Sequence, residues 1–476
     1  MKILLMVPPP KNALTLELSN EIAQSMGNFP PLGILYLATY LKERTDFELR
    51  VLDSEALGYG LDEVEEVFKE FQPDVVGITA FTNTLYDAVQ TIKSAKKILP
   101  QSIICLGGPH VALYPEESLH FNEVDFAIAG DGEISFHDLL KVLSEKELSL
   151  EAREERLKKI DGLIFRTKKG VLKNGYARIM DLDALPIPDR SFLDTSLYYC
   201  ILGKKRTFTT VMSSRGCPFQ CTFCNTPDKI YRYRNPVGVV DEIEDIAARG
   251  IEEIFFFDDL FNISEKRVIA ICDEIIRRNI KIHWAFRGRV NGVTEELIVK
   301  AKAAGCERVQ FGIEKGSNNG LKLVKKGITV EEVRKAVDLT KKHGLTTVGN
   351  FLIGTPEETK ADILQTIDFS LTLKLDHAEF NTFTPYPGTQ IYEDGLRSGL
   401  YPKDLWREFA LNPHPDFTIS WNEILSDAEL NRLNVLATKK FYFRPRIFWN
   451  ELKSLTSFEE FKRKLSGAKI VLGLRA

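Results

Sequence analysis

The chain has 476 residues, of which 44% are hydrophobic and 27% charged, a composition typical of an ordinary globular protein with two or three domains. Its net charge of −4 gives no indication of a nucleic-acid partner. Seven cysteines in a chain of this length do not form the dense, even pattern of a secreted disulfide scaffold, so we expect a reducing, cytoplasmic setting. The opening MKILLMVPPPKN has too short an apolar run for a signal peptide, and no stretch of about 18 apolar residues predicts a membrane span.

The first part of the chain alternates short β-rich runs with helical patterns, which predicts a parallel sheet covered on both faces. The expected strands are Lys2–Val7, Glu48–Leu52, Val75–Thr79, Ile103–Leu106 and Phe126–Ala129, with helices at Ile34–Lys42, Leu61–Glu70 and Tyr86–Leu99. Sheets of this kind bind ligands beyond the carboxyl ends of their strands. Loop-forming residues follow several of these strands, at Pro8–Pro10, Thr79–Thr82, Gly107–Pro109 and Gly130–Gly132.

Residues 148–204 predict a linker between two larger domains. Residues 161–180 indicate two short strands around a glycine-containing turn, and the proline-rich stretch LDALPIPDRSFLD indicates an extended connector. A catalytic thiol at Cys200 is conceivable. For Cys105, Cys272 and Cys306 we expect burial as unreactive thiols.

Residues 205–390 contain a second series of alternating strands and helices. The expected strands are Phe208–Met212, Glu253–Phe257, Lys281–Phe286, Arg308–Gly312, Thr347–Leu352 and His377–Thr382. The expected helices are Val239–Arg249, Glu265–Arg278, Thr294–Ala304, Val330–His343 and Asp362–Leu373. In barrels built from such units, the chemistry is placed at the carboxyl ends of the strands.

The loop after the first of these strands, SSRGCPFQCTFCNTP, carries three closely spaced thiols at Cys217, Cys221 and Cys224. Three ligands are too few for a closed structural zinc site, which takes four. They suit a 4Fe–4S cube with one iron left open to a substrate or cofactor, since a cube held only by protein takes four cysteines. A zinc site with a fourth ligand from elsewhere and a purely structural role are the alternatives.

Residues 391–476 predict a mainly helical C-terminal segment that caps the substrate or serves as an accessory. Within it, Lys439–Ser454 mixes basic and aromatic residues. Such a segment can pack on the barrel with its cations at a solvated edge, which we favour, or lie on a membrane surface. The second alternative leads to a lipid substrate and a membrane-peripheral location.

The three-cysteine spacing, with Phe223 just before the last cysteine, resembles the signature of the radical SAM enzymes over residues 205–390. The resemblance implies a partial (β/α)6 barrel in which the open iron chelates S-adenosylmethionine (SAM). It implies that Asp258 and Asp259 approach the SAM amino group, that Arg287 or Arg289 pairs with its carboxylate, and that Glu314 accepts hydrogen bonds from the ribose or pairs with a lysine. Phe223, Gly349, Phe351 and Gly354 are implied at the adenine, Phe351 standing where isoleucine is usual.

Residues 1–147 resemble the flavodoxin-like (Rossmann) cobalamin-binding domain attached to many radical SAM enzymes, on the stretches FPPLGILYLATYL, GITAFTNT, LGGPHVALYPEE and DFAIAGDGE. The DxHxxG motif that supplies a histidine to cobalt is missing, which implies cobalamin without such a ligand. The implied contacts are Pro8, Pro9, Thr79, Thr82, Gly107, Gly108, His110, Gly130, Gly132 and Glu133. The alternatives are a domain that only recruits a partner and, for His110, a surface position.

Together the two resemblances imply an α/β enzyme that cleaves SAM by one electron from a flavodoxin or ferredoxin and uses cobalamin to methylate an unactivated carbon of a small molecule or lipid. A cobalamin-dependent cyclase or oxidase, like the cyclase of magnesium-porphyrin esters, is the first alternative. A non-catalytic iron–sulfur and cobalamin sensor is the second.

Overall fold

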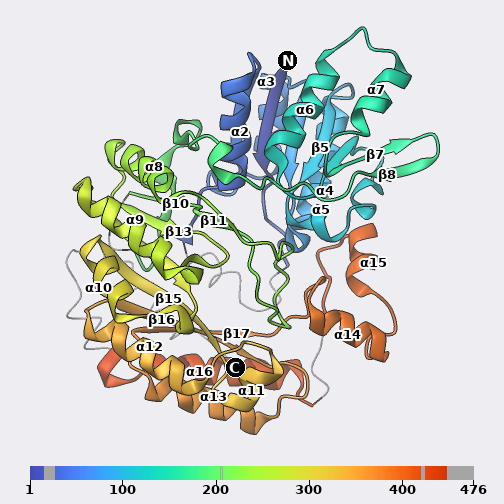
Figure 1. The fold of residues 1–476 in the computed structure, drawn as a ribbon. Coiled ribbons are helices and arrows are strands. Elements are labelled where there is room, and N and C mark those ends of the chain that lie inside the picture. The colour runs from blue at the N-terminus through green and yellow to red at the C-terminus, as the bar shows by residue number, and fades with distance from the viewer. Residues whose placement is uncertain (15–26, 204, 206, 420–423, 448–476) are drawn as a thin grey trace. The chain divides into compact units, whose positions relative to one another are not determined.

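The computed structural model describes residues 1–14, 27–203, 205, 207–419 and 424–447. The chain forms two compact units, which are considered one at a time (Figure 1). The first unit comprises Met1–Leu14, Pro30–Leu197 and Leu396–Thr418. The second comprises the described residues of Thr15–Phe29, Tyr198–Gly395 and Ile419–Ala476.

The first unit is built on a seven-stranded sheet in the order β3-β1-β4-β5-β6-β7-β8. Its strands are β1 (Lys2–Val7), β3 (Glu48–Asp53), β4 (Val75–Thr79), β5 (Ile103–Gly107), β6 (Phe126–Ile128), β7 (Leu163–Thr167) and β8 (Gly170–Lys173). The five predicted strands run parallel, as expected. The hairpin β7–β8, which we expected inside a separate linker, instead joins the edge of this sheet antiparallel to β6. The free edge of the short strand β6 offered backbone groups that the hairpin could pair.

The helices of the first unit are α2 (Leu32–Arg44), α3 (Leu61–Phe71), α4 (Leu85–Ile98), α5 (Pro109–Leu113), α6 (Gly132–Ser144), α7 (Leu150–Leu157) and α15 (Leu405–Leu411). Helix α3 shows why the pattern folds this way, because Val64, Val67, Phe68 and Phe71 recur at helical spacing and are all buried. Helix α15 comes from the predicted C-terminal segment. Its Arg407 pairs with Glu117 at 2.7 Å, so residues 396–418 belong to the first unit.

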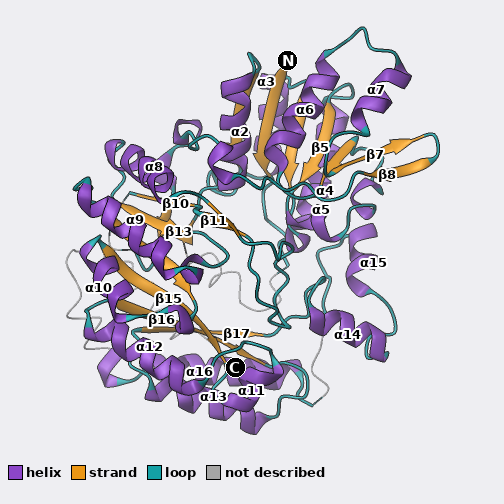
Figure 2. Ribbon diagram, in the orientation of Figure 1, coloured by secondary structure: helices purple, strands orange, loops and turns teal. Residues whose placement is uncertain are grey.

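The second unit is built on six parallel strands in the order β10-β13-β14-β15-β16-β17 (Figure 2). They are β10 (Phe208–Val211), β13 (Glu253–Phe256), β14 (His283–Gly288), β15 (Cys306–Glu314), β16 (Thr346–Ile353) and β17 (His377–Thr382). The helices are α8 (Pro236–Ala248), α9 (Glu265–Arg277), α10 (Glu295–Ala303), α11 (Asn318–Leu323), α12 (Val330–Lys342), α13 (Lys360–Thr372) and α16 (Asp427–Tyr442). Helix α14 (Gln390–Ser398) crosses the boundary between the units. All six predicted strands and their five helices are present.

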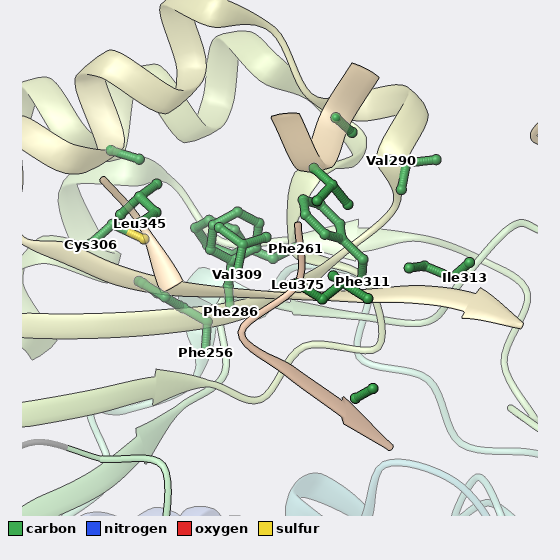
Figure 3. Packing of buried hydrophobic residues seen from close by; sticks show 14 of the residues in the cluster. Phe256, Phe261, Phe286, Val290, Cys306, Val309, Phe311, Ile313, Leu345 and Leu375 are labelled. Atoms are coloured by element: carbon green, nitrogen blue, oxygen red, sulfur yellow. The ribbon is translucent and has the colours of Figure 1, made fainter. Parts of the chain in front are cut away.

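One face of the six-stranded sheet is apolar and packs against the surrounding helices. Alternate residues such as Phe256, Phe286, Phe311 and Phe351 are fully buried in one hydrophobic cluster. Figure 3 shows part of this cluster filling the space between sheet and helices. Because successive side chains of a strand point to opposite faces, the residues between them face the inside of the curved sheet.

This inner face carries polar and aromatic side chains. The Gln310 side chain of β15 donates from Nε2 to Glu379 Oε2 of β17 at 3.3 Å, across the intervening strand β16. Adjacent strands lie about 4.8 Å apart, so the two long side chains lean toward each other over β16. Phe29 comes from the N-terminal part of the chain and packs edge-on against Phe208 at 5.3 Å between ring centroids.

The described part of the basic and aromatic C-terminal segment packs on the second unit, as we favoured. Phe441 is fully buried, and the Tyr442 hydroxyl donates to Ala378 O at 3.1 Å. Arg446 Nη2 donates to Leu375 O at 2.6 Å. Residues 448–454 of the predicted segment lie outside the described residues. Of the helices in the described ranges, none combines the length and the apolar character needed to cross a bilayer.

Candidate functional site

The loop that follows β10 lies at the carboxyl end of that strand and carries the three cysteines. All three are half-buried: Cys217, Cys221 and Cys224. Two short strands, β11 (Ser214–Arg215) and β12 (Arg232–Tyr233), pair antiparallel at its base. The Cys217 amide donates to Asp228 O at 3.1 Å. The loop is therefore held by its own backbone.

Gly216 and Asp228 fix the turn next to the first cysteine. Gly216 has φ +82°, and a Cβ there would lie 2.2 Å from Ile230 O, so only glycine fits. The Asp228 carboxylate accepts from Arg232 Nη2 at 2.6 Å, and both side chains are buried. It also accepts from the Ile230 amide at 3.0 Å.

Asp258 is fully engaged in holding this loop to the sheet. It accepts hydrogen bonds from the Ser213 amide at 2.7 Å and from the Ser213 and Ser214 hydroxyls, each at 2.6 Å. Burial raises the pKa of Asp258, an effect that the nearby Arg267 and the hydrogen bonds oppose. The structure therefore corrects the expectation that Asp258 approaches the SAM amino group, because its oxygens are buried and taken by the loop.

Asp259, the next residue, keeps an exposed side chain beside the cysteine loop. One oxygen accepts from the Gly216 amide at 2.9 Å. Although solvent reaches it, partial burial raises the pKa of Asp259, and the charges of Asp258 and Asp228 add to that rise. Of the two adjacent carboxylates, Asp259 is the one that a ligand can reach.

The electrostatics of the cysteines test whether the loop fits an iron–sulfur cube. Burial raises the pKa of Cys217, and the charges of Cys224 and Cys221 raise it further, so the thiols are close neighbours. Within the described residues, no three His, Cys, Asp or Glu side chains gather around one point as a single metal ion would require. A cube takes one thiolate at each of three separate irons, so neighbouring thiols that do not meet at one point fit it better than they fit zinc.

The two candidate arginines of β14 and its end lie in different places. Arg289 stacks on Phe219 at 3.8 Å, reaches Cys221 Sγ with Nη1 at 3.8 Å and donates to Lys326 O. Its cation therefore stands against the cysteine loop. Arg287 lies two residues earlier on the strand and points to the inner face, over the rings of Phe255 and Phe257.

Glu314 ends β15 in a conformation that few non-glycine residues adopt, with φ +71°, after a register irregularity against β16. Its carboxylate accepts from Lys326 Nζ at 2.7 Å, which is the lysine pairing that we kept as an alternative to ribose binding. The same ammonium lies 5.7 Å from the Phe223 ring centre. Phe223, Glu314 and Lys326 are thus adjacent.

The glycine-rich strand β16 corrects two predicted adenine contacts. Phe351 is buried on the outer face, where it stacks on Phe380 at 5.1 Å, and a Cβ at Gly349 would point into the side chains of Leu375 and Ile313. Both residues therefore face the helices, not the inside of the barrel. Gly354 lies at the strand end with φ +81° and stays a candidate.

In the first unit, the predicted cobalamin contacts gather at one edge of the sheet. They follow the neighbouring strands β1, β4, β5 and β6: Pro8, Pro9, Thr79, Thr82, Gly107, Gly108, Gly130, Gly132 and Glu133. Thr79 and Gly107 are register partners. Gly108 has φ +97°, and a Cβ there would lie 2.7 Å from Ala80 O, so the ends of β4 and β5 approach closely.

The predictions for His110 were contact with cobalamin or a surface position. In the structure it is fully buried, so it is neither at the surface nor open to a ligand. Its exposed fraction is 0%, Nδ1 lies 3.2 Å from the Thr82 hydroxyl, and Nε2 has no hydrogen-bond partner in the structure. Burial lowers the pKa of His110 to about 3. The imidazole is therefore neutral in the folded protein at ordinary pH.

This burial predicts an acid-sensitive first unit. The pKa of His110 in the folded state is below its unfolded value of about 6.5, so below pH 6.5 the imidazole is protonated in the unfolded chain but not in the folded one. The free energy of unfolding therefore falls as the pH drops below 6.5. Between pH 7 and pH 5 we expect a loss of about 2 kcal/mol. Hydrogen-exchange mass spectrometry of β4 and α5 peptides should show it in the wild type and in the exposed control His120→Gln. An equal loss in His110→Gln would contradict the assignment.

Comparison with known proteins accounts for this geometry. Residues 211–370 match the model of the radical SAM superfamily, and residues 22–140 match that of the B12 binding domain. The chain is 34% identical to the uncharacterized methyltransferase PH0819 of Pyrococcus horikoshii, over 95% of each chain. This protein belongs to the cobalamin-dependent radical SAM enzymes. It is also 29% identical to the anaerobic magnesium-protoporphyrin IX monomethyl ester cyclase of Rubrivivax gelatinosus, over 78% of this chain and 67% of the cyclase.

A solved structure shares the fold of this radical SAM enzyme. It is that of the radical SAM methyltransferase TsrM from Kitasatospora setae with cobalamin and a 4Fe–4S cluster bound, which matches with a TM-score of 0.65 and 22% identity, over 83% of this chain and 75% of that one. The expected fold class is thereby confirmed: an N-terminal B12-binding domain, a radical SAM barrel and a helical C-terminal part.

Two residues of the radical SAM site were missed by sequence reasoning. Lys326 lies in the turn LVKKGI, where positive φ at Lys325 and Gly327 places it beside Glu314. Asp228 holds the cysteine loop from its far side. For Lys326, the glycine that follows the two lysines indicates a tight turn. Nothing in the sequence distinguishes Asp228 from a solvated aspartate.

Proposed function

We propose that this enzyme uses a 4Fe–4S cluster, SAM and cobalamin to transfer a methyl group to an unactivated carbon of a small-molecule substrate. The observation that carries the proposal is the braced loop of Cys217, Cys221 and Cys224 at the carboxyl end of β10, with the Arg289 cation against it. The functional division is proposed as predicted, with residues 1–147 for cobalamin and 205–390 for radical chemistry, joined by 148–204 and followed by 391–476.

The described side chains suggest a division of labour around SAM. We assign Arg289 to the carboxylate, because a guanidinium suits a planar anion and this one already touches the cysteine loop. Asp259 is assigned to the amino group, since it is the reachable carboxylate of the pair. We assign Glu314, which pairs with Lys326, to the ribose, and Phe223 and Gly354 to the adenine.

When bound, the cluster and SAM supply radical chemistry and cobalamin supplies a methyl carrier. The chain's own residues bind, orient and shield. Asp258 and Gly216 keep the cysteine loop in one conformation, and the apolar outer core keeps the sheet rigid beneath it. In the first unit, a Cβ at Gly107 would meet nothing within 4 Å, so the end of β5 is open to a ligand, whereas Gly108 and Gly130 allow close contact with neighbouring backbone. The first loop contains no histidine for cobalt.

The electron donor is proposed to be a flavodoxin or ferredoxin, in the cytoplasm. A lipid substrate and membrane contact gain little support from the described half of Lys439–Ser454, because Phe441 and Tyr442 are used in packing. Phe443 is 57% exposed, but a single exposed ring is ordinary on a protein surface. A small polar or amphipathic molecule is the simpler substrate.

Anaerobic reconstitution with cobalamin and methyl-deuterated SAM tests the proposal. We expect bound iron, sulfide and cobalt, formation of 5′-deoxyadenosine and S-adenosylhomocysteine under strong reduction, and deuterium-labelled methyl groups in a product formed from cell extract. 5′-Deoxyadenosine with an unlabelled, ring-closed or oxidised product would favour the cyclase or oxidase alternative. No SAM cleavage by the loaded protein would contradict the proposal altogether.

A further inference from the structure

The inner face of the six-stranded sheet presents a guanidinium without a counter-ion. Arg287 of β14 has no carboxylate within ion-pair distance in the described part of the chain. Its guanidinium lies over the faces of Phe255 and Phe257, at 5.6 and 5.4 Å from the ring centres. Its side chain is accessible to solvent, yet protein surrounds it closely enough that burial lowers its pKa. An unpaired, partly desolvated cation is costly unless a ligand neutralises it.

A carboxylate and two amides follow Arg287 on the next strands of the same inner face, and Gln310 of β15 is its register partner. Gln310 Nε2 donates to Asn350 Oδ1 at 3.0 Å and to Glu379 Oε2 at 3.3 Å. Glu379 is near enough to act electrostatically on Arg287, but the two are not in ion-pair contact. Burial raises the pKa of Glu379, and Arg287 and Arg308 oppose that rise.

An aromatic wall stands beside the guanidinium. Phe29, Phe255 and Phe257 pack with ring centroids 6.0 to 6.3 Å apart. Phe255 is buried, whereas 41% of Phe257 is exposed although it directly follows a central strand. An exposed phenyl ring on the inner face of a barrel, next to an unpaired cation, offers a flat apolar surface to a ligand.

We propose that Arg287 binds an acidic group of the substrate, a carboxylate or a phosphate, while the planar apolar body of the substrate lies against Phe257. This inference rests on the proposed function and names the class of molecule that the enzyme accepts. Glu379, already held by Gln310, receives a hydrogen-bond donor of the same substrate. The guanidinium of Arg287 suits this role because it can bind a carboxylate or a phosphate through two parallel hydrogen bonds.

SAM does not need this arginine. Arg289 is the residue that touches Cys221, and Arg287 lies two residues earlier on the strand, about 7 Å further from the carboxyl end. Arg287 is a specificity-determining residue in this assignment, and Arg289 serves the cofactor.

Ligand-observed 19F NMR on the anaerobically reconstituted full chain tests the assignment. The probes are 4-fluorophenylacetate, 4-fluorophenyl phosphate and, as the uncharged comparison, 4-fluorobenzyl alcohol. We expect at least one anionic probe to bind about tenfold more tightly than the alcohol, the scale of one charge-assisted contact, and the tighter of the two distinguishes carboxylate from phosphate. Equal binding of all three probes would overturn the inference.

The variants localise the effect. Arg287→Gln should lose the preference for the anionic probe, and Arg287→Lys should keep part of it. Arg277→Gln, at an exposed position of α9, is the matched control with full preference. Thermal unfolding checks that each variant is folded. If Arg287→Gln keeps the anion preference but binds SAM more weakly, Arg287 serves SAM and the inference is wrong. SAM cleavage by the wild type is read separately, so its failure refutes the proposed function and not the anion site.

Discussion

Alanine at Cys217, Cys221 or Cys224 is expected to abolish SAM cleavage. Each replacement removes one of three thiolates that the loop offers, and the other cysteines of the described residues are buried. Iron and sulfide content and the visible absorption of the cluster should fall with activity, and 5′-deoxyadenosine should drop to the level without enzyme.

Cys272→Ala is the matched control for these variants. Cys272 lies in the same unit but is buried in the hydrophobic cluster around α9, and burial raises its pKa to about 12, so it is an inert thiol. Its replacement should cost about 1 kcal/mol of stability through a small cavity and leave the iron content unchanged. Iron retained in all three loop variants, or lost equally in Cys272→Ala, would refute the cluster assignment.

Asp258→Ala and Asp259→Ala are expected to fail in different ways, although the residues are neighbours. Loss of Asp258 leaves the Ser213 amide and two buried hydroxyls without an acceptor and leaves Arg267 without its nearby negative charge, at a cost of about 3–5 kcal/mol. The cysteine loop should then lose its position, and cluster loading should fall together with the unfolding temperature.

Asp259→Ala should instead load its cluster normally. Asp259 is exposed and holds the loop through one bond to Gly216, so its loss should act on SAM affinity, by about tenfold. Equilibrium dialysis with SAM and iron analysis of the two variants separate these outcomes. Normal iron with weakened SAM binding in Asp258→Ala would return that residue to its originally expected role.

Much of this architecture is predictable from local pattern. The strand Lys2–Val7 begins and ends as predicted because it is a short apolar run, and His377–Thr382 does so because its apolar residues alternate with polar ones. The cysteine loop is equally recognisable, since three ligands close in sequence must lie close in space.

The errors come from information that sequence neighbours do not carry. Successive residues of a strand point to opposite faces, so aligning a motif one residue off along β16 predicts the wrong face. The sequence therefore predicts Phe351 and Gly349 at the adenine, whereas both face the helices. Asp258 finds its partners at Ser213 and Ser214, about 45 positions away, so its structural role is invisible locally. The burial of His110 likewise depends on how α5 packs.

The interleaving of the two units has a consequence for how the protein can be divided. Each unit draws on three separate stretches of chain, and Phe29 completes an aromatic wall whose other rings, Phe255 and Phe257, follow more than two hundred residues later. No single cut between positions 147 and 205 releases two self-sufficient halves. During synthesis the aromatic wall can form only after residues up to Phe257 have been made. Recombination that exchanges one half between relatives would therefore separate Phe29 from the rings that it packs against.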